Sequence, residues 1–330
     1  MNFNNKVFLI TGGTGSFGRA FSIYLLKFHK PKKIIIFSRD EFLQFEMSKE
    51  EIYKKNEKIM RFFIGDVRDY KRLEYAMYKV DYVIHAAALK QVPTAEYNPD
   101  EFVKTNIIGA QNVIDACIAT NVKKVVALST DKAAAPINLY GATKLCSDKL
   151  FTSANNKIGD RKIIFSVVRY GNVMGSRGSV IPYFMRLKKS EAFPITDTRM
   201  TRFNITMNES INLVFFALEN GKGSEIFVPK IPSYKILDVA KAINGNCKIK
   251  IVGIRAGEKI HEEMITESDS YSTFDLGNCY TIVNPSNRLV LRFYKKNKKF
   301  KKVPENFSYN SGENDHNLTV KQLRDLINKI

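Results

Sequence analysis

Short apolar runs alternate with longer stretches of helical periodicity through the first half of the chain. The apolar runs predict buried strands at 6–10, 33–37, 60–64, 81–85, 124–129 and 162–168. The stretches between them predict helices, which include 68–79, 100–120 and 139–154. Because strands and helices alternate, we predict an α/β fold in which helices cover both faces of a doubly wound parallel sheet.

After Tyr170 the pattern becomes more mixed. It predicts helices at 179–189, 207–219 and 235–244 and short strands at 225–229 and 248–252. A chain of 330 residues suits one large or two modest domains. We predict a nucleotide-binding domain over 1–170, a smaller, mainly substrate-binding α/β part over 171–285 with some segments returning to the core, and a basic tail region over 286–330.

The first strand leads into a glycine-rich turn, TGGTGSFG at 11–18, and then into an apolar helical stretch. Gly12, Gly15 and Gly18 have the spacing G-x-x-G-x-x-G. Glycines permit a tight turn and let the backbone approach a pyrophosphate at the N-terminus of the helix. Because this motif follows a strand and opens a helix, it predicts the dinucleotide site of a Rossmann fold rather than a structural turn alone.

The end of the second predicted strand bears on the choice of cofactor. The sequence there is Ser38-Arg39-Asp40. Proteins that bind NAD usually place an acid about 20 residues after the glycines, on the ribose hydroxyls, so Asp40 leaves NAD open. The planar fork of Arg39 can bind a 2′-phosphate instead, which favours NADP.

The end of the fifth predicted strand carries the candidate chemistry. Ser129-Thr130-Asp131-Lys132 is followed by Tyr140 and Lys144, which share one face of a predicted helix because they are four positions apart. A free phenol has a pKa of about 10, and we expect a neighbouring ammonium group to lower it. These groups can take a proton from an alcohol while a nicotinamide takes a hydride. Simple alcohol oxidation does not need Asp131 or Lys132.

The strongly positive net charge raises the question of a nucleic-acid partner. The net charge is +19, and much of it lies in Arg292 to Lys302. We interpret this run as a solvated loop and expect no nucleic-acid partner, because the sequence contains no nucleic-acid-binding module. A basic surface can still help to recruit anionic nucleotides.

Cysteine usage and hydropathy indicate a cytosolic protein. The four cysteines are scattered without a C-x-x-C pair, so we expect reduced thiols. The four histidines have no metal-ligand spacing, and we interpret His85 as a core histidine with a hydrogen-bond partner. The sequence shows neither a membrane span nor a cleavable leader.

Together these motifs resemble the extended short-chain dehydrogenase/reductase family, and within it the inverting UDP-N-acetylglucosamine 4,6-dehydratases that open pseudaminic-acid biosynthesis. The resemblance extends over nearly the whole chain. In the first half it is carried by TGGTGSFG at 11–18, SRDE at 38–41, RFFIGDVRD at 61–69, HAAALK at 85–90, AEYNP at 95–99, KTNIIGAQNVIDAC at 104–117, LSTDKAA at 128–134 and PINLYGATKLCSDKL at 136–150. In the second half it is carried by RYGNVMGSRGSV at 169–180, PITDTRMTRF at 194–203, EIFVPKIPS at 225–233 and GIRAGEK at 253–259.

The resemblance implies two groups of binding residues. Those implied for NADP are Gly12, Thr14, Gly15, Ser16, Phe17, Gly18, Ser38, Arg39, Asp40, Glu41, Phe42, Leu43, Asp66, Val67, Ala86, Thr105, Asn106, Tyr140, Lys144 and Val173. Those implied for the UDP-sugar substrate are Lys90, Asn172, Arg177, Gly178, Ser179, Val180, Thr196, Arg202 and Glu258. It also implies a homo-oligomer, because members of the family often form hexamers.

The implied reaction is a redox-neutral dehydration with inversion at carbon 5 of the sugar. The residues implied to carry it are Thr130, Asp131, Lys132, Tyr140 and Lys144, with Lys132 as the base at carbon 5. Retaining relatives have Asp-Glu where this chain has Asp131-Lys132, so the pair indicates the inverting branch. We expect burial or nearby cations to lower the pKa of Lys132 so that it can act as a base.

Several positions depart from the pattern of the family, and two alternatives stay open. Gln91, Ala135 and Asn204 replace the usual residues, and the chain contains no tryptophan. Gln91 and Asn204 affect the expected fit of the substrate but remove no proposed catalytic group. One alternative is a nucleotide-sugar 4-epimerase, which would not need Asp131 and Lys132. The other is a non-catalytic nucleotide- or RNA-binding protein, suggested by the basic run.

Overall fold

A ten-stranded sheet forms the centre of the molecule. The computed structural model describes residues 2–176, 178–187 and 192–329. The strand order in the sheet is β16-β14-β15-β10-β6-β5-β4-β1-β2-β3. The parallel strands are β1 (Val7–Thr11), β2 (Lys33–Ser38), β3 (Met60–Ile64), β4 (Tyr82–His85), β5 (Lys124–Thr130), β6 (Ile164–Tyr170) and β10 (Glu225–Pro229). The predicted doubly wound α/β fold is thus confirmed.

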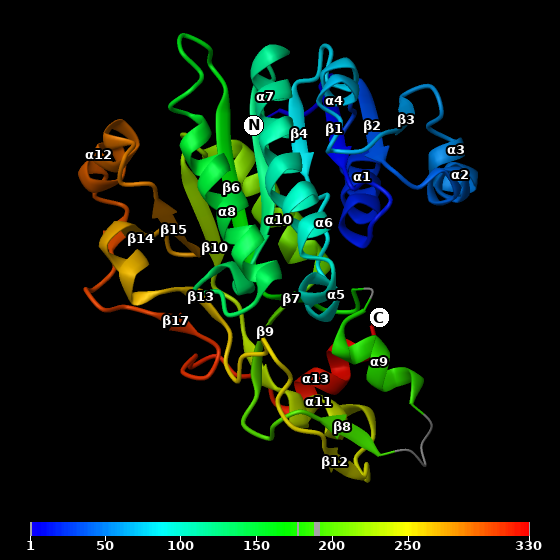
Figure 1. The fold of residues 1–330 in the computed structure, drawn as a ribbon, viewed down its shortest axis with the longest axis vertical. Coiled ribbons are helices and arrows are strands. Elements are labelled where there is room, and N and C mark those ends of the chain that lie inside the picture. The colour runs from blue at the N-terminus through cyan, green and yellow to red at the C-terminus, as the bar shows by residue number, and fades with distance from the viewer. Residues whose placement is uncertain (1, 177, 188–191, 330) are drawn as a thin grey trace.

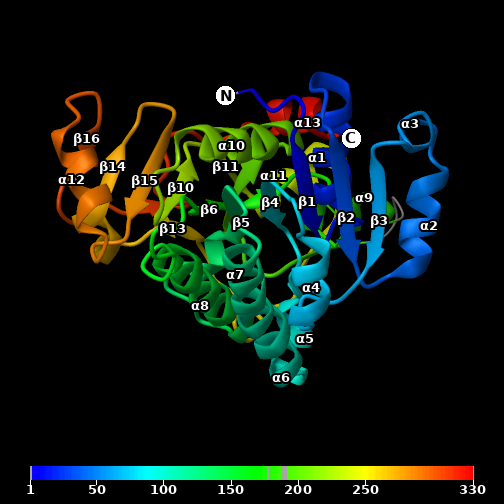
Figure 2. The ribbon, with the colours of Figure 1, turned by 90° about the horizontal axis from the view of Figure 1, so that it is seen from above.

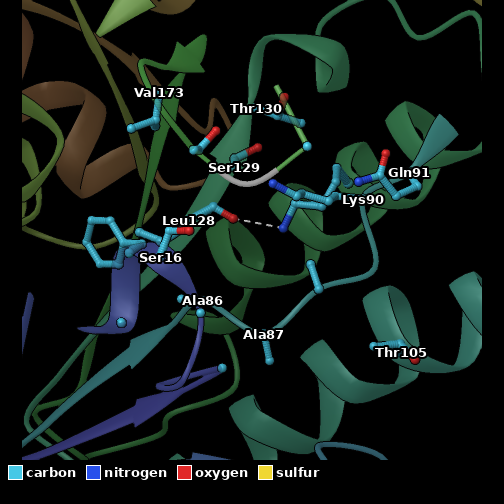
Figure 3. Close-up of a pocket in the computed structure, with 18 of the residues that line it drawn as sticks. Ser16, Ala86, Ala87, Lys90, Gln91, Thr105, Leu128, Ser129, Thr130 and Val173 are labelled. Carbon is cyan, nitrogen blue, oxygen red and sulfur yellow. Dashed lines mark hydrogen bonds between the residues drawn. The ribbon is translucent and has the colours of Figure 1, made fainter. Parts of the chain in front are cut away.

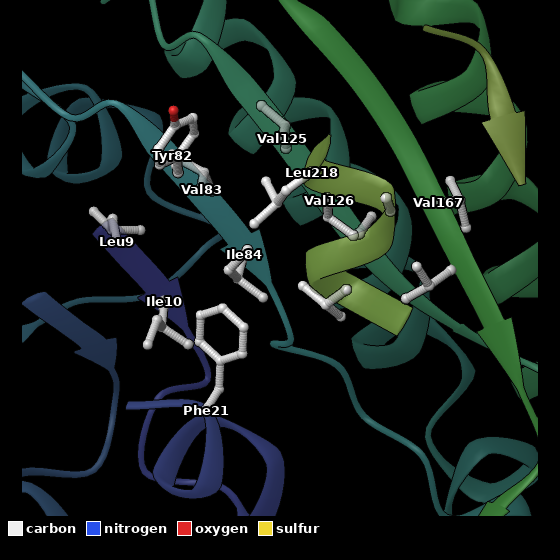
Figure 4. Packing of buried hydrophobic residues seen from close by; sticks show 14 of the residues in the cluster. Leu9, Ile10, Phe21, Tyr82, Val83, Ile84, Val125, Val126, Val167 and Leu218 are labelled. Carbon is white, nitrogen blue, oxygen red and sulfur yellow. The ribbon is translucent and has the colours of Figure 1, made fainter. Parts of the chain in front are cut away.

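Helices cover both faces of this sheet (Figure 2). One face carries α1 (Ser16–Phe28) and α10 (Met207–Asn220), and the other carries α4 (Tyr70–Ala76), α7 (Gly109–Ala119) and α8 (Leu139–Ala154). Strands β1 and β4 are buried along their whole length and are mainly apolar, because helices cover both faces of the sheet. Ile10, Ile84 and Val126 lie side by side on β1, β4 and β5, and Phe21 of α1 lies beside Ile10 in the core (Figure 4).

A smaller lobe lies beyond the carboxyl ends of the parallel strands (Figure 1). It consists of β7 (Asn172–Val173), α9 (Val180–Arg186), β8 (Phe193–Ile195), β9 (Thr201–Ile205), β11 (Ser233–Lys235), α11 (Ile236–Ile243), β12 (Ile249–Ile251) and α13 (Val320–Ile327). Its own apolar cluster includes Phe184, Phe193, Tyr234, Val239 and Leu323. Helix α13 belongs to the last part of the chain and packs on α11, while β10 returns to the large sheet. The three-part division by residue range stays a prediction.

The far edge of the large sheet is antiparallel. It consists of β15 (Cys279–Val283), β14 (Thr273–Asp275) and β16 (Lys301–Lys302). Helix α12 (Arg288–Lys296) packs here through Val290 and Tyr294, which lie one turn apart and meet Phe274. The prediction of a loop is therefore wrong over 292–296, because this apolar pair forms a buried helix face. The lysines of the run are exposed, as expected.

Three further features complete the fold. A two-stranded sheet joins β13 (Glu263–Ile265) to β17 (Tyr309–Asn310), and α2 (Glu41–Lys49) with α3 (Glu51–Lys54) follow β2. The predicted helix 100–120 is divided into α6 (Pro99–Phe102), a π-helical turn over Val103–Ile108 and α7, with α5 (Val92–Tyr97) before them. All four cysteines are free thiols. No helix in the described part of the chain is long and apolar enough to cross a lipid bilayer.

Candidate active site

A cavity of about 680 Å³ opens at the carboxyl ends of the central parallel strands. Many of the predicted residues line it, and Figure 3 shows several of them facing one another. Those that line it are Gly12, Thr14, Gly15, Ser16, Phe17, Gly18, Ser38, Arg39, Asp40, Val67, Ala86, Lys90, Thr105, Thr130, Lys132, Tyr140, Lys144, Asn172, Val173, Gly178 and Ser179. Gln91, Ser129, Tyr170 and Met207 line it too. One cavity thus joins the predicted cofactor, catalytic and substrate residues.

Other predicted residues lie just behind the wall of the cavity or away from it. They are Glu41, Phe42 and Leu43 in the first turn of α2, Asp66, Asn106, Asp131, Val180 at the start of α9, Thr196 after β8, Arg202 and Glu258. Arg177 lies outside the described residues.

The glycine turn between β1 and α1 shapes one end of the cavity. Gly12 has a φ of +65°, and a Cβ atom there would lie 2.9 Å from the Ala87 backbone. A Cβ atom on Gly18 would lie 2.5 Å from the Cα atom of Gly13, so only glycine lets α1 pack this close to the turn. The N-cap residue of α1 is Gly15, which has no side chain to cap the helix. The free amide groups of its first turn can therefore bind a diphosphate.

The side chains after β2 divide their roles between structure and binding. The Asp40 carboxylate accepts a hydrogen bond of 2.8 Å from the Leu43 backbone amide and so caps α2. Arg39 lines the cavity and is half exposed, and its guanidinium is 3.9 Å from the Asp66 carboxylate. Asp66 is held mainly by Arg68 at 2.7 Å, and although burial opposes ionisation, these bonds keep the pKa of Asp66 below its ordinary value. Arg39 is therefore the cation available to a ligand at this end.

The π-helical turn directs two neighbouring side chains inward. Asn106 donates to the Leu89 carbonyl and to the Thr143 hydroxyl, and accepts from the Leu89 amide. It therefore clamps the loop after β4 against α8 instead of lining the cavity. The Thr105 hydroxyl is buried at the cavity wall and has no hydrogen-bond partner among the described residues. Such an orphaned polar atom fits a bound ligand.

The candidate catalytic groups meet where β5 ends. Thr130 closes the strand and its hydroxyl donates to the Asp131 carboxylate at 2.9 Å. Lys132 donates to the same Asp131 oxygen at 3.1 Å. Helix α8 brings Tyr140 and Lys144 to this turn because Gly141 has no side chain, and a Cβ atom there would overlap the Lys132 carbonyl. Lys144 donates to the Leu128 carbonyl at 2.8 Å (Figure 3).

The expectation that an ammonium group lowers the pKa of Tyr140 is wrong for this structure. Burial raises the pKa of Tyr140 to about 12, and Lys132 and the Thr130 hydroxyl oppose this only in part. Burial also lowers the pKa of Lys144, whose ammonium group is committed to a carbonyl. The loss of hydration outweighs the nearby positive charge.

The expectation that burial or cations lower the pKa of Lys132 is wrong for a different reason. Burial does act in that direction, but Asp131 and Glu262 together raise the pKa of Lys132 well above its ordinary value. Glu262 is 3.1 Å from the Lys132 ammonium group and is 2% exposed. Sequence reasoning missed Glu262, which follows GIRAGEK at 253–259 by only three positions. The Asp131 carboxylate is fully buried, and burial raises its pKa.

The predicted substrate residues Arg202 and Glu258 lie behind the same cluster. Arg202 is buried, donates to the Thr201 and Ile260 carbonyls, and lies 3.6 Å from both Glu258 and Glu262. One Glu258 oxygen is buried without a partner among the described residues. The two residues thus form an ion pair next to the catalytic turn. Their predicted contact with substrate stays a prediction.

Known proteins resemble this chain over most of its length. Residues 8–284 match the family described as polysaccharide biosynthesis protein. The chain is 55% identical to UDP-N-acetylglucosamine 4,6-dehydratase (inverting) of Campylobacter jejuni, over 99% of this chain and 98% of that one. It is 47% identical to UDP-glucose 4-epimerase of Rickettsia bellii, over 85% of this chain and 83% of that one. The X-ray structure of Pen from Bacillus thuringiensis has a TM-score of 0.89 at 39% identity, with 100% of this chain and 99% of that one covered. The resemblance indicated by the motifs is confirmed.

Proposed function

The chain belongs to the polysaccharide biosynthesis protein family, a branch of the extended short-chain dehydrogenases/reductases, and on this premise we propose that it is an NADP-dependent, inverting UDP-N-acetylglucosamine 4,6-dehydratase. The proposed product is UDP-2-acetamido-2,6-dideoxy-β-L-arabino-hex-4-ulose. The observation that carries the proposal is the Asp131–Lys132 ion pair, 3.1 Å long, in the turn beside which α8 presents Tyr140 to the cavity. It supplies the acid and the base that an elimination needs and an alcohol oxidation does not.

The described residues suit a dinucleotide. The uncapped N-terminus of α1 fits the diphosphate, the orphaned Thr105 hydroxyl faces the cavity, and Arg39 fits a 2′-phosphate. Tyr140 and Lys144 would hold the ribose next to the nicotinamide. When bound, NADP supplies hydride acceptance at carbon 4 of the sugar and hydride return to carbon 6.

The side chains carry the proton transfers. Tyr140 accepts the proton of the carbon-4 hydroxyl, and Thr130 and Lys132 stabilise its phenolate. The new ketone acidifies the hydrogen on carbon 5, which Lys132 removes in its neutral form. Asp131 in its acid form protonates the carbon-6 hydroxyl, which leaves as water. A proton from solvent then reaches carbon 5 from the opposite face and inverts it, and Tyr140 releases to solvent the proton that it accepted, so that the protons balance.

The ion pair itself can generate both reactive forms. Transfer of one proton from the Lys132 ammonium group to the Asp131 carboxylate yields a neutral amine and a carboxylic acid. The bond between them is already formed, and burial raises the pKa of Asp131, which favours its acid form. Elimination of water returns Lys132 to the ammonium form and Asp131 to the carboxylate. The pair is therefore restored without an outside proton.

The wider setting belongs to the same proposal. The enzyme would be a hydro-lyase of the cytoplasm, would act as a homo-oligomer, in the manner of family members that often form hexamers, and would open pseudaminic-acid or related deoxy-sugar biosynthesis. Its partner would be the UDP-sugar, with no nucleic acid and no membrane span. A second candidate is a nucleotide-sugar 4-epimerase, favoured by the likeness to the Rickettsia bellii protein. An epimerase would share Thr130, Tyr140 and Lys144 but would release no water.

One experiment decides between these functions. Purified protein is incubated with UDP-N-acetylglucosamine in heavy water and followed by proton NMR and mass spectrometry. The dehydratase loses one water, gains deuterium at carbon 5 and forms the L-arabino 4-keto sugar. Deuterium with retained configuration would assign the retaining reaction instead. Epimerised sugar of unchanged mass would replace the proposal with the second candidate.

Lys132→Ala tests the assigned base. We expect water loss and carbon-5 exchange to fall by at least about a hundredfold, because no other amine contacts Asp131 in the described part of the chain. Binding of NADP, measured by calorimetry, stays unchanged. Lys71→Ala removes an exposed lysine away from the cavity and serves as the control. Carbon-5 exchange at the wild-type rate in Lys132→Ala would remove Lys132 from this role.

A further inference from the structure

Glu262 lies in the loop before β13 and reaches the catalytic turn from another part of the chain. Its carboxylate is 3.1 Å from the Lys132 ammonium group and 3.6 Å from Arg202. The Glu262 side chain does not line the cavity, and its second oxygen is buried without a hydrogen-bond partner among the described residues. A buried carboxylate in this condition is costly for folding. A function that depends on its charge would account for it.

The geometry gives Lys132 two carboxylate partners of different kinds. Asp131 and Glu262 are each 3.1 Å from its ammonium group. Asp131 precedes Lys132 in the same turn, so their bond does not fix that turn relative to the smaller lobe. The bond to Glu262 connects the turn with the segment that precedes β13, and the pairing of Glu262 with Arg202 of β9 extends this link to the smaller lobe.

The backbone of Glu262 is held firmly enough for this task. Its amide donates to the Ser311 hydroxyl at 2.8 Å, and the Ser311 amide donates to the Glu262 carbonyl at 2.8 Å. The Ser311 hydroxyl also bonds Thr201 at 2.7 Å. The carboxylate is therefore presented from a fixed backbone and not from a mobile loop.

We propose that Glu262 is a positioning residue for the dehydration, which holds the Lys132 ammonium group in a fork with Asp131 and sets the pH at which Lys132 gives up its proton. The inference rests on the proposed function. Arg202 and Lys132 keep Glu262 ionised although burial opposes this, since they hold its pKa below the ordinary value. Glu262 in turn adds to Asp131 in raising the pKa of Lys132.

The groups around Lys132 determine what a change at Glu262 should do. The charged and titratable groups that interact with Lys132 include Asp131, Glu262, Arg202, Tyr140, Lys90, Lys259 and Tyr234. The elimination uses the one proton that Asp131 and Lys132 share, so the rate falls as pH rises through the pKa at which Lys132 loses that proton to solvent. Removal of one negative charge lowers that pKa. The falling limb of the pH profile therefore moves to lower pH.

The test compares Glu262→Gln, Glu262→Asp and the control Glu263→Gln. Glu263 is the next carboxylate along β13, is half buried and makes no ion pair with Lys132. For Glu262→Gln we expect kcat for water loss at pH 8 to fall about tenfold to a hundredfold, with the falling limb at lower pH and NADP affinity within about twofold. Glu262→Asp keeps the negative charge but moves it away from Lys132. We therefore expect kcat to fall and the limb of the pH profile to stay at its wild-type pH. Glu263→Gln behaves as the wild type.

Three other results would overturn the inference. A lower kcat in Glu262→Gln with an unmoved limb would show a structural role only, and an unchanged kcat would show none. An equal loss in Glu263→Gln would show a general effect of charge. If Glu262→Gln does not fold, wild-type kcat in Glu262→Asp rejects the positioning role, and a loss of at least about tenfold supports it. Wild-type protein that releases no water would refute the proposed function, a different outcome from all of these.

Discussion

At the scale of the residue, Arg39 and Asp40 show how one hydrogen bond can decide between two cofactors. From the sequence alone either side chain could meet the ribose. Both residues line the cavity, but the Asp40 carboxylate already accepts a hydrogen bond of 2.8 Å from the Leu43 amide, whereas Arg39 is half exposed. A charge-assisted hydrogen bond contributes about 1.5–3 kcal/mol, which corresponds to about tenfold to a hundredfold in affinity. We therefore predict that NADP binds more tightly than NAD.

Arg39→Ala should therefore weaken NADP and spare NAD. We expect the Kd of NADP to rise about tenfold to a hundredfold and that of NAD to change less than about twofold, because only NADP carries the 2′-phosphate. Titration calorimetry with both nucleotides measures this, and Arg161→Ala, on an exposed loop away from the cavity, is the control. An equal loss for both nucleotides would assign Arg39 to the part they share.

His85 makes the stability of the fold depend on pH. It is 2% exposed, its Nδ1 atom bonds the Thr11 hydroxyl at 2.8 Å, and its ring lies 5.4 Å from that of Phe151. The interpretation of His85 as a core histidine is confirmed. Burial lowers its pKa from 6.5 to about 3. Below about pH 6.5 the unfolded chain therefore binds a proton at His85 that the folded chain does not bind. Acid therefore favours unfolding.

His85→Gln should flatten this pH dependence. The free energy of unfolding of the wild type falls with decreasing pH, and His85 accounts for up to about 1.4 kcal/mol per pH unit between about pH 6 and pH 4. Urea denaturation at a series of pH values should give a shallower slope for the variant than for the wild type. Parallel slopes would show that His85 is protonated in the folded protein.

Glu262 marks the limit of what single residues reveal in the sequence. Thr130, Asp131, Lys132, Tyr140 and Lys144 could be predicted because they lie close together along the chain, and Tyr140 and Lys144 also have a helical spacing. Glu262 is far from them in sequence and meets Lys132 only in the folded chain. The pKa shifts of Tyr140 and Lys132 could not be predicted either, because the first follows from burial and the second depends on Glu262 as well as Asp131.

At the scale of the element, apolar runs in the sequence predicted the strands reliably, whereas local irregularities of the helices could not be predicted. The strands of the parallel sheet follow the predicted ranges closely because both faces of the sheet are buried. The π-helical turn over Val103–Ile108 has no periodic signal and lies inside a predicted helix, yet it directs Thr105 to the cavity. Helix α12 was not predicted, because its many lysines made the segment look like a solvated loop although Val290 and Tyr294 form a buried face.

Gly141 controls how closely α8 approaches the catalytic turn. A Cβ atom there would overlap the Lys132 carbonyl and lie 3.0 Å from Pro136. Gly141→Ala should therefore push α8 outward and lower kcat about a hundredfold, because displacements near 1 Å are enough for that. Steady-state kinetics measures it, and Gly245→Ala is the control, since a Cβ atom on Gly245 meets nothing within 4 Å.

Thermal unfolding separates displacement from loss of the fold. If the Gly141→Ala protein is folded at the assay temperature and has a low kcat, the steric role of Gly141 is confirmed. A variant with wild-type kcat would show that α8 tolerates the shift. Either result bears on Tyr140 and Lys144 alike, because both are carried by this helix.

At the scale of the whole molecule, strand order brings the site together. The cavity lies where β1 and β4 are neighbours although β2 and β3 separate them in sequence, which is where doubly wound sheets bind ligands. The motifs at the ends of these strands predicted this place. The smaller lobe was less predictable, because its short strands and helices come from separate parts of the chain that extend to α13.

The basic run lies at the opposite edge of the sheet from the cofactor end of the cavity. Helix α12 packs beside β14 and β15, whereas the glycine turn follows β1 (Figure 1). Lys295, Lys296, Lys298 and Lys299 are exposed there and do not line the cavity. They can attract an anionic substrate only through long-range fields, which salt screens beyond about 8 Å at 0.15 M ionic strength.

Changing these four lysines to glutamine therefore separates an enzyme from a nucleic-acid-binding protein. We expect kcat for water loss to be unchanged and kcat/KM to fall less than about threefold at 0.15 M salt, with a larger difference at low salt, where the field reaches further. Steady-state kinetics at a series of salt concentrations measures both. A dehydratase keeps its turnover because its proton-transfer groups lie in the turn after β5. Loss of turnover at 0.15 M salt would show that the run acts at the site, and tight RNA binding by the wild type that the variant lacks would revive the RNA-binding alternative.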